Sequence, residues 1–245
     1  VLLGAFALVE AKHKNPLLPL RIPRDRNRGG SYLTSILLGA AIFGASLFLT
    51  YYFQQVLDYT PIQAGLASLP ISLGVFAAAG VLGKVLPKIG PRPVMIAGSL
   101  FGAAGMALLA QIQVDSNFWA LIFPGELLFG LGMGMIFVPL ANIALINIEP
   151  DDAGVASAVL NASQQVGGSL GTALLNSVYT SAVTAYLADH AIQNPQDPQA
   201  LVHGFEVGFW WSAGLMLIGT VVITLMIRAG KGDLVEQEGV PVHAG

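Results

Sequence analysis

The chain has 245 residues, of which 54% are hydrophobic and only 10% charged, and its net charge is −3. About a quarter of the residues of a typical soluble domain are charged, so this composition excludes an ordinary soluble domain and indicates a membrane protein. The chain contains no cysteine, which excludes a disulfide framework and a thiolate metal site. We also find no cleavable signal peptide and no basic patch suited to nucleic acid.

The sequence opens inside an apolar run, residues 1–9 (VLLGAFALV), that is too short to span a bilayer. We expect it to be the end of a span that begins before the sequence given; a short interfacial helix is the alternative, but this run lacks the polar face of such a helix. Residues 10–30 follow as a proline-interrupted linker with six cations. They are Lys12, Lys14, Arg21, Arg24, Arg26 and Arg28. We interpret this linker as a topology signal, with binding of anionic lipid headgroups as the alternative.

Six apolar segments are then long enough to cross a hydrocarbon layer, which takes about 20 helical residues. They are residues 31–53, 62–82, 93–112, 118–140, a long helical pattern over 153–187 with its membrane part at 162–182, and 207–227. The predicted fold class is therefore an all-α membrane protein with six complete transmembrane helices plus the end of a seventh.

The segments between the predicted spans differ sharply in charge. Residues 83–92 (GKVLPKIGPR) form a tight basic hairpin with Lys84, Lys88 and Arg92, and short basic loops collect on the cytoplasmic side. With this hairpin inside, all eleven Lys and Arg residues fall in inner segments and none in outer loops. The inner loop at 142–154 is acidic, but acids contribute little to orientation. We therefore predict a multi-pass protein of the plasma (inner) membrane, with basic loops and C-terminus in the cytoplasm.

Polar residues at membrane depth are the candidates for a functional site, because they are expensive in lipid. Glu126 is the only ionisable residue placed inside a span, either as a counter-charge or proton carrier, or as an interfacial carboxylate that reaches the outer headgroups. Asn142, Asn161, Gln164 and Gln165, together with Asn176, either line a substrate cavity or bond neighbouring helices to one another. Of Asn161, Gln164 and Gln165, two can share one face of a helix.

Other motifs are explained by membrane packing. The glycine pairs Gly98/Gly102 and Gly167/Gly171 are spaced four apart, which lets helices approach closely. The GxGxG string in the fourth span lacks the preceding strand of a nucleotide site, and the sequon at Asn161 lies within a predicted membrane helix. The four histidines lie outside the predicted spans and far apart in the sequence, so we predict no catalytic residues and no metal site. A channel is also disfavoured, because no filter loop is visible.

At the basic hairpin the sequence resembles the second-half loop motif of the major facilitator superfamily, G-x-x-x-D-[RK]-x-G-x-[RK]. Gly83, Lys88, Gly90 and Arg92 match, whereas Pro87 replaces the acid, which puts an acid-based gating contact in doubt. NPLLPLRI, YYFQQVLDYTPIQAGLASLP and GLGMGMIFVPLANIAL…AGVASAVLNASQQVGGSLGTAL are similar to the fourteen-span drug:proton antiporter branch, the EmrB/QacA type. The resemblance covers nearly the whole chain.

The resemblance implies that residues 1–9 end the eighth span and that the six complete spans are the ninth to fourteenth. They would form a C-terminal six-helix domain over residues 31–228, made of two inverted three-helix repeats. Residues 1–30, the end of the preceding span and a basic cytoplasmic linker, would come before it, and a polar cytoplasmic tail at 229–245 would follow. Its partners would be the lipid bilayer, a missing N-terminal half and a small hydrophobic substrate.

The expected function is therefore export of hydrophobic or cationic compounds by proton antiport. No cofactor is expected, since the proton gradient supplies the energy. The alternatives are uptake of a metabolite, or a membrane scaffold or receptor that does not transport.

Overall fold

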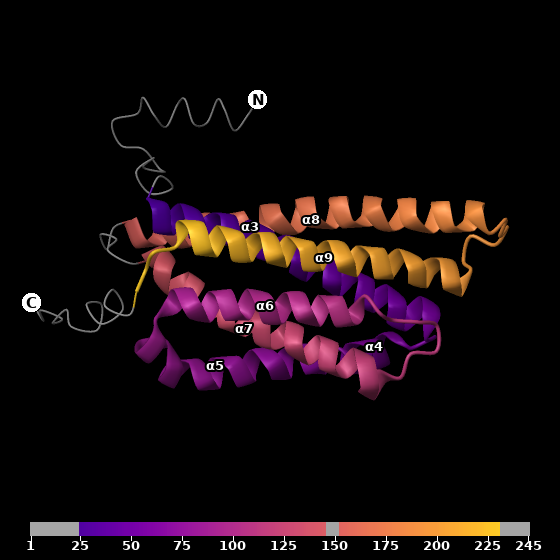
Figure 1. The fold of residues 1–245 in the computed structure, drawn as a ribbon, viewed down its shortest axis with the longest axis horizontal. Coiled ribbons are helices and arrows are strands. Elements are labelled where there is room, and N and C mark those ends of the chain that lie inside the picture. Colours follow the sequence, from indigo (N-terminus) through magenta and orange to yellow (C-terminus); the bar gives the residue numbers. More distant parts are fainter. Residues whose placement is uncertain (1–24, 146–151, 231–245) are drawn as a thin grey trace, which may run out of the picture.

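The computed structural model describes residues 25–145 and 152–230, and it is a bundle of long helices lying side by side (Figure 1). The helices are α3 (Arg26–Tyr51), α4 (Pro61–Ala67), α5 (Leu69–Ile89), α6 (Pro91–Leu109), α7 (Phe123–Leu145), α8 (Ala153–Asp189) and α9 (Pro198–Met226). Two short π-helices, η1 (Tyr52–Val56) and η2 (Phe118–Ile122), extend α3 and lead into α7. The predicted all-α fold class is confirmed. The predicted end of a preceding span at 1–9 lies outside the described residues.

Five of the described helical segments are long and apolar enough to cross a membrane. They are Arg26–Val56, Pro61–Ile89, Pro91–Leu109, Phe118–Ala144 and Pro198–Met226. The remaining predicted span is α8, which at 37 residues is the longest helix but is too polar to join this set by composition. It nevertheless runs the length of the bundle beside α3 and α9 (Figure 1). Because α8 belongs to the bundle, a position outside it does not explain why this helix is polar.

The helices pack as two related triplets, α3–α5–α6 and α7–α8–α9. The first helix of each triplet packs on the second helix of the other, in the pairs α3/α8 and α7/α5, and the two third helices, α6 and α9, pack on each other. The triplets also run in opposite directions, since α3 starts at one end of the bundle and α7 at the other (Figure 1). This is the arrangement of two inverted three-helix repeats.

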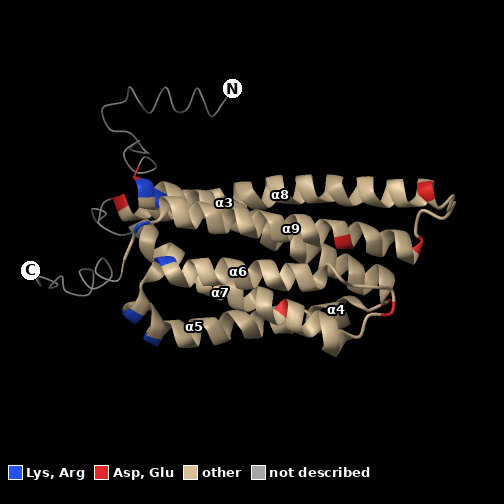
Figure 2. Ribbon diagram, viewed as in Figure 1, with Lys and Arg blue, Asp and Glu red and all other residues tan. Residues whose placement is uncertain are grey.

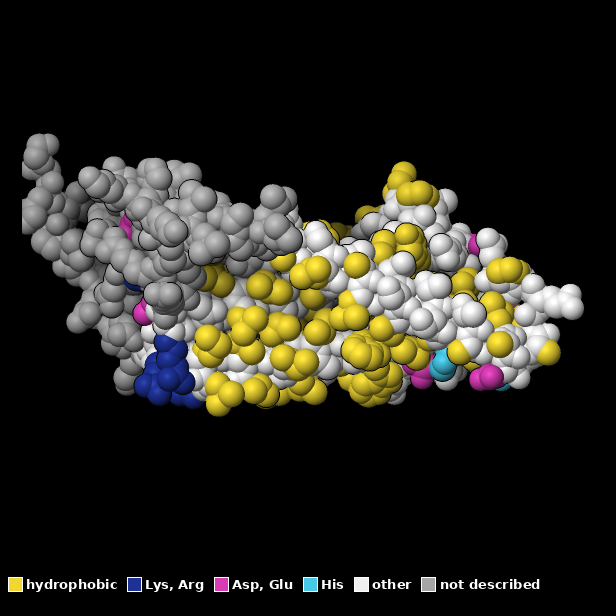
Figure 3. Space-filling view, turned by 90° about the horizontal axis from the view of Figure 1, so that it is seen from above, with side chains coloured by type: hydrophobic (Ala, Val, Ile, Leu, Met, Phe, Trp, Pro, Cys, Tyr) yellow, Lys and Arg dark blue, Asp and Glu magenta, His cyan; other side chains and the backbone are white. Residues whose placement is uncertain are grey.

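Charge and hydropathy are sorted along the bundle. The Lys and Arg residues that the structure describes gather at one end (Figure 2). Figure 3 shows a long face on which hydrophobic side chains lie between basic residues at one end and acidic and histidine residues at the other. Exposed hydrophobic side chains of α9 include Trp210, Trp211, Ile218 and Leu225. Such a band is expected of a surface that contacts lipid.

Two predicted connections are shorter than the sequence indicated. The basic hairpin at 83–92 is not a loop: α5 continues through Pro87 to Ile89, α6 starts at Pro91, and only Gly90, with a φ of 85°, breaks the helix. Likewise, α9 starts inside the outer loop predicted at 189–206. The Asp197 side chain accepts hydrogen bonds from the backbone N–H groups of Gln199 and Ala200, and Pro198 occupies the first turn, so a strong N-cap starts the helix early.

An aromatic cluster fixes α3 against α8 and α9. Phe48 of α3 is fully buried, and its ring centroid lies 5.7 Å from that of Tyr179 on α8 and 6.0 Å from those of Phe205 and Phe209 on α9. Tyr52 continues the cluster, and its hydroxyl donates to the Gln113 carbonyl at 2.7 Å. Buried aromatic pairs of this kind make large contact areas, so the relative position of these three helices is well defined.

Candidate functional site

One side of α8 carries a row of polar, uncharged side chains that no neighbouring helix covers. Asn161, Gln165, Ser169 and Asn176 are exposed and Thr172 is half-buried. Their spacing, at positions i, i+4, i+8, i+11 and i+15, places them on one face of the helix. We call this row the polar face of α8. The exposed residues Val166, Leu170 and Leu174 lie on another side of the same helix.

Close packing on α3 holds this face outward. A Cβ atom added at Gly167 would lie 2.6 Å from the backbone carbon atoms C and Cα of Ile36, and one added at Gly171 would collide with Ala40. On the α3 side, a Cβ at Gly39 would meet the backbone of Gln164. The structure thus confirms the predicted close contact at the Gly167/Gly171 pair, because only glycine lets the two backbones approach this closely.

A hollow of about 300 Å³ opens between α3 and the polar face of α8. Phe43, Ser46, Leu47 and Thr50 of α3 and Thr172 of α8 line it. The Thr50 hydroxyl donates to the Ser46 carbonyl at 2.7 Å, so this wall combines an aromatic ring and aliphatic carbon with hydroxyl oxygen. An apolar hollow with a few polar groups is typical of small-molecule sites, and its volume is at the lower end of their range.

The structure brings some of the predicted site residues together and separates others. Asn161 and Gln165 share the polar face, one turn apart, and the Asn161 amide donates to the Ser157 carbonyl at 3.1 Å. Gln164 is half-buried on the side of α8 that packs on α3. Asn142 lies on α7, near the end of that helix, and is also half-buried. The substrate-lining role of these residues stays a prediction.

Sequence reasoning missed the α3 wall of the hollow. Phe43, Ser46 and Thr50 follow each other at i, i+3 and i+7, which is the spacing of one helix face. That spacing was available as a signal. It does not reveal, however, whether the face packs inside the bundle or lies open, because this depends on where α8 sits.

Glu126 lies in the first turn of α7 and is fully buried, with 0% of its surface exposed. Neither of its carboxylate oxygens has a hydrogen-bond partner within the described residues. An isolated buried carboxylate is very costly in its charged form, so this environment favours the neutral acid. In this conformation the carboxyl group has no exposed surface that a ligand could reach.

The motif residues Gly83, Lys88, Gly90 and Arg92 lie around the α5–α6 turn. Arg92 donates from its guanidinium group to the Thr224 carbonyl at 2.7 Å, and Arg26 donates in the same way to the Leu225 carbonyl. Both bonds reach the last turn of α9, whose carbonyl groups have no partner within the helix and carry partial negative charge. The motif arginine thus joins the start of α6 to the end of α9. A gating role for the motif stays a prediction.

No group of three or more His, Asp or Glu residues in the described part of the chain is placed to hold a metal ion.

Residues 4–172 match the sequence model of the Major Facilitator Superfamily. The chain is 40% identical over 230 residues to the puromycin resistance protein pur8 of Streptomyces alboniger, covering 93% of this chain and 46% of that protein.

Two further relatives are more distant. The multidrug resistance protein B homolog of Mycobacterium tuberculosis is 30% identical over 168 residues, covering 68% of this chain and 31% of that protein. The tetracenomycin C resistance and export protein of Streptomyces glaucescens is 29% identical over 219 residues, covering 87% and 40%. The chain therefore spans less than half the length of these curated relatives.

The fold also resembles a solved structure from a study of substrate recognition in proton-dependent oligopeptide transporters. The TM-score is 0.66 at 17% sequence identity, over 83% of this chain and 42% of that one. The likeness at this identity concerns the fold.

Proposed function

The chain belongs to the major facilitator superfamily, a family of membrane transport proteins rather than enzymes, and we propose that it forms the C-terminal half of a drug exporter. In this proposal a second six-helix half, elsewhere in the same protein, packs on the side that carries the polar face of α8. Substrate binds between the halves and is released outward as the two halves rock against each other.

The polar face of α8 carries this proposal. Amide and hydroxyl side chains that face hydrocarbon lose their hydrogen bonds to water, which costs free energy at each residue. In a membrane-embedded bundle, a water-filled cavity or another protein surface would therefore best supply hydrogen-bond partners for the uncovered side chains of this row, Asn161, Gln165, Ser169 and Asn176. The relatives that match this chain are more than twice as long, which leaves room for such a second half.

The proposed substrate class follows from the chemistry of the hollow and from the relatives. The hollow offers the Phe43 ring, aliphatic carbon and hydroxyl oxygen, and no charged residue lines it. Such a wall suits hydrophobic compounds, including cations, because aromatic rings attract positive charge. The Streptomyces relatives, a puromycin resistance protein and a tetracenomycin C resistance and export protein, support the outward direction.

We propose that Glu126 takes up and releases the proton that drives export. Among the described Asp, Glu, Lys, Arg and His residues it is the only one that is buried, and it has no ionic partner there. A carboxyl group held neutral in one state of the bundle can lose its proton when a rearrangement admits water. We propose that the protein lies in the plasma membrane with the basic end of the bundle on the cytoplasmic side. The sorting of the described Lys and Arg residues to one end supports this orientation (Figure 2).

The test is ethidium efflux from a drug-sensitive host that produces the whole protein. We expect lower accumulation than in cells with an empty vector, and a protonophore should abolish the difference. Thr172→Trp fills the hollow and should block efflux, whereas the matched variant Leu174→Trp places the same ring on the other side of α8 and should leave efflux intact. Equal accumulation with and without the protein would reject export, and equal loss in both variants would reject the assigned face.

A further inference from the structure

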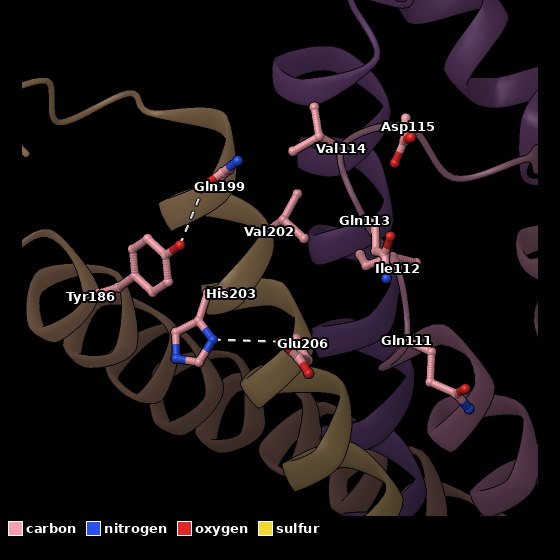
Figure 4. A pocket seen from close by; sticks show the side chains of 10 residues that line it. All are labelled: Gln111, Ile112, Gln113, Val114, Asp115, Tyr186, Gln199, Val202, His203 and Glu206. Atoms are coloured by element: carbon pink, nitrogen blue, oxygen red, sulfur yellow. Dashed lines mark hydrogen bonds and ion pairs between the residues drawn. The ribbon is translucent and has the colours of Figure 1, made fainter. Parts of the chain in front are cut away.

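A second, larger pocket lies at the end of the bundle opposite the described Lys and Arg residues. It has a volume of about 550 Å³ and lies between the loop that follows α6, the end of α8 and the start of α9 (Figure 4). It shares no lining residue with the hollow between α3 and α8. Its volume is ample for a small organic molecule.

An aromatic shelf forms one wall of this pocket. The Tyr186 ring stacks on His190 with a centroid distance of 4.1 Å and packs on His203 at 5.1 Å. The Tyr186 hydroxyl lies 3.4 Å from the Gln199 side-chain oxygen, to which it donates. Figure 4 shows Tyr186 beside Gln199 and His203, which both come from α9. The contacts with these two residues and with His190 hold the ring in place beside the pocket.

Two carboxylates from separate elements complete the site. Asp115 comes from the loop after α6 and Glu206 from α9, and Glu206 Oε2 lies 3.5 Å from His203 Nδ1. No Lys or Arg lines the pocket, and those in the described part of the chain gather at the far end of the bundle (Figure 2). A hollow lined by charge of one sign concentrates counter-ions of the other sign.

We propose that this pocket binds a small organic cation, namely an ammonium group joined to a carbon body. Carboxylates on two walls attract the positive charge, and the Tyr186 shelf adds cation–π attraction, as in sites for quaternary ammonium ligands. Amide side chains such as Gln199 supply hydrogen bonds. Such a ligand comes either from the surrounding water or from the headgroup of a lipid with an amine. The inference does not rest on the proposed export function, because it concerns equilibrium binding at the outer end alone.

The test is equilibrium binding of radiolabelled choline to the whole protein in nanodiscs of phosphatidylglycerol. We expect saturable binding at millimolar concentrations or below, with no competition from 3,3-dimethylbutan-1-ol, the neutral analogue of the same shape. Loss of one charge-assisted contact should weaken binding by about tenfold or more in Glu206→Gln and in Asp115→Asn. Asp58→Asn removes the same charge at the same end, outside the pocket, and should leave the affinity within about twofold.

Two further measurements identify the source of the ligand and test the contribution of the Tyr186 ring. If phosphatidylethanolamine in the nanodisc competes with choline, the lipid headgroup is the resident ligand; if it does not, the ligand is a soluble cation, and either result agrees with the proposal. Tyr186→Phe keeps the ring and should bind choline like the parent protein, whereas Tyr186→Leu should bind more weakly. No saturable binding, or an affinity equal in Glu206→Gln, Asp115→Asn and Asp58→Asn, would overturn the proposal.

Discussion

Replacing Gly167 by alanine should force helices α3 and α8 apart. The added Cβ would lie 2.6 Å from the Ile36 C and Cα atoms, well inside an ordinary van der Waals contact, and these are backbone atoms that a rotamer change cannot move. Overpacking of this kind costs about 1–3 kcal/mol. At roughly 2–4 °C per kcal/mol for a domain of this size, the Tm should fall by about 2–12 °C.

The matched control is Gly214→Ala on α9, where an added Cβ meets nothing within 4 Å. Alanine is the better helix former by about 1 kcal/mol, so this variant should melt at or slightly above the parent temperature. The assay is thermal unfolding of the purified whole protein in detergent, followed by fluorescence. If Gly167→Ala melts at the same temperature as Gly214→Ala, the close approach of α3 and α8 is wrong, and with it the orientation of the polar face.

Substitutions at Glu126, on the polar face of α8 and at Arg92 test the roles given to these residues. Glu126→Gln keeps a neutral side chain of the same shape and should leave the Tm unchanged while proton-driven efflux falls at least about tenfold; full efflux would reject the proton role. Asn161→Ala with Gln165→Ala removes exposed polar groups and should change stability by no more than about 0.5 kcal/mol, while the KM for exported drugs rises; an unchanged KM across several drugs would contradict the lining role. Arg92→Ala loses the bond to the Thr224 carbonyl and should cost about 0.5–1.5 kcal/mol in unfolding experiments, whereas Arg92→Lys should lose less; equal melting of all three proteins would reject this contact.

Much of the fold was predictable because membrane helices follow rules of length and composition. The long helix at 153–187 is α8, and the Gly98/Gly102 and Gly167/Gly171 pairs lie at close helix contacts. The error at 83–92 arose because Pro87 and Gly90 both resemble breaks, and only the glycine is one. The error at the start of α9 arose because hydropathy does not detect an N-cap such as Asp197, which lies before the apolar run.

The sites were harder to predict because they depend on contacts between segments far apart in the sequence. From the sequence, Glu126 fits an interfacial carboxylate as well as a proton carrier. Its burial depends on how the surrounding helices pack. The outer pocket joins residues 111–115 to Tyr186 and Glu206, and no local spacing connects these segments. The polar residues of α8 were identifiable as candidates, but their division between an open face and a packed face required the position of α3.

Water accessibility along α8 shows directly whether its polar face borders the substrate path. The chain contains no cysteine, so single cysteines at Asn161, Gln165 and Asn176 can be compared with those at Val166 and Leu170 in the whole protein, after removal of any cysteine elsewhere. We predict that a water-soluble thiol reagent labels the first group, that an exported drug slows this labelling, and that the second group stays unreactive in lipid. Equal labelling of both groups, or faster labelling of Val166 and Leu170, would contradict it.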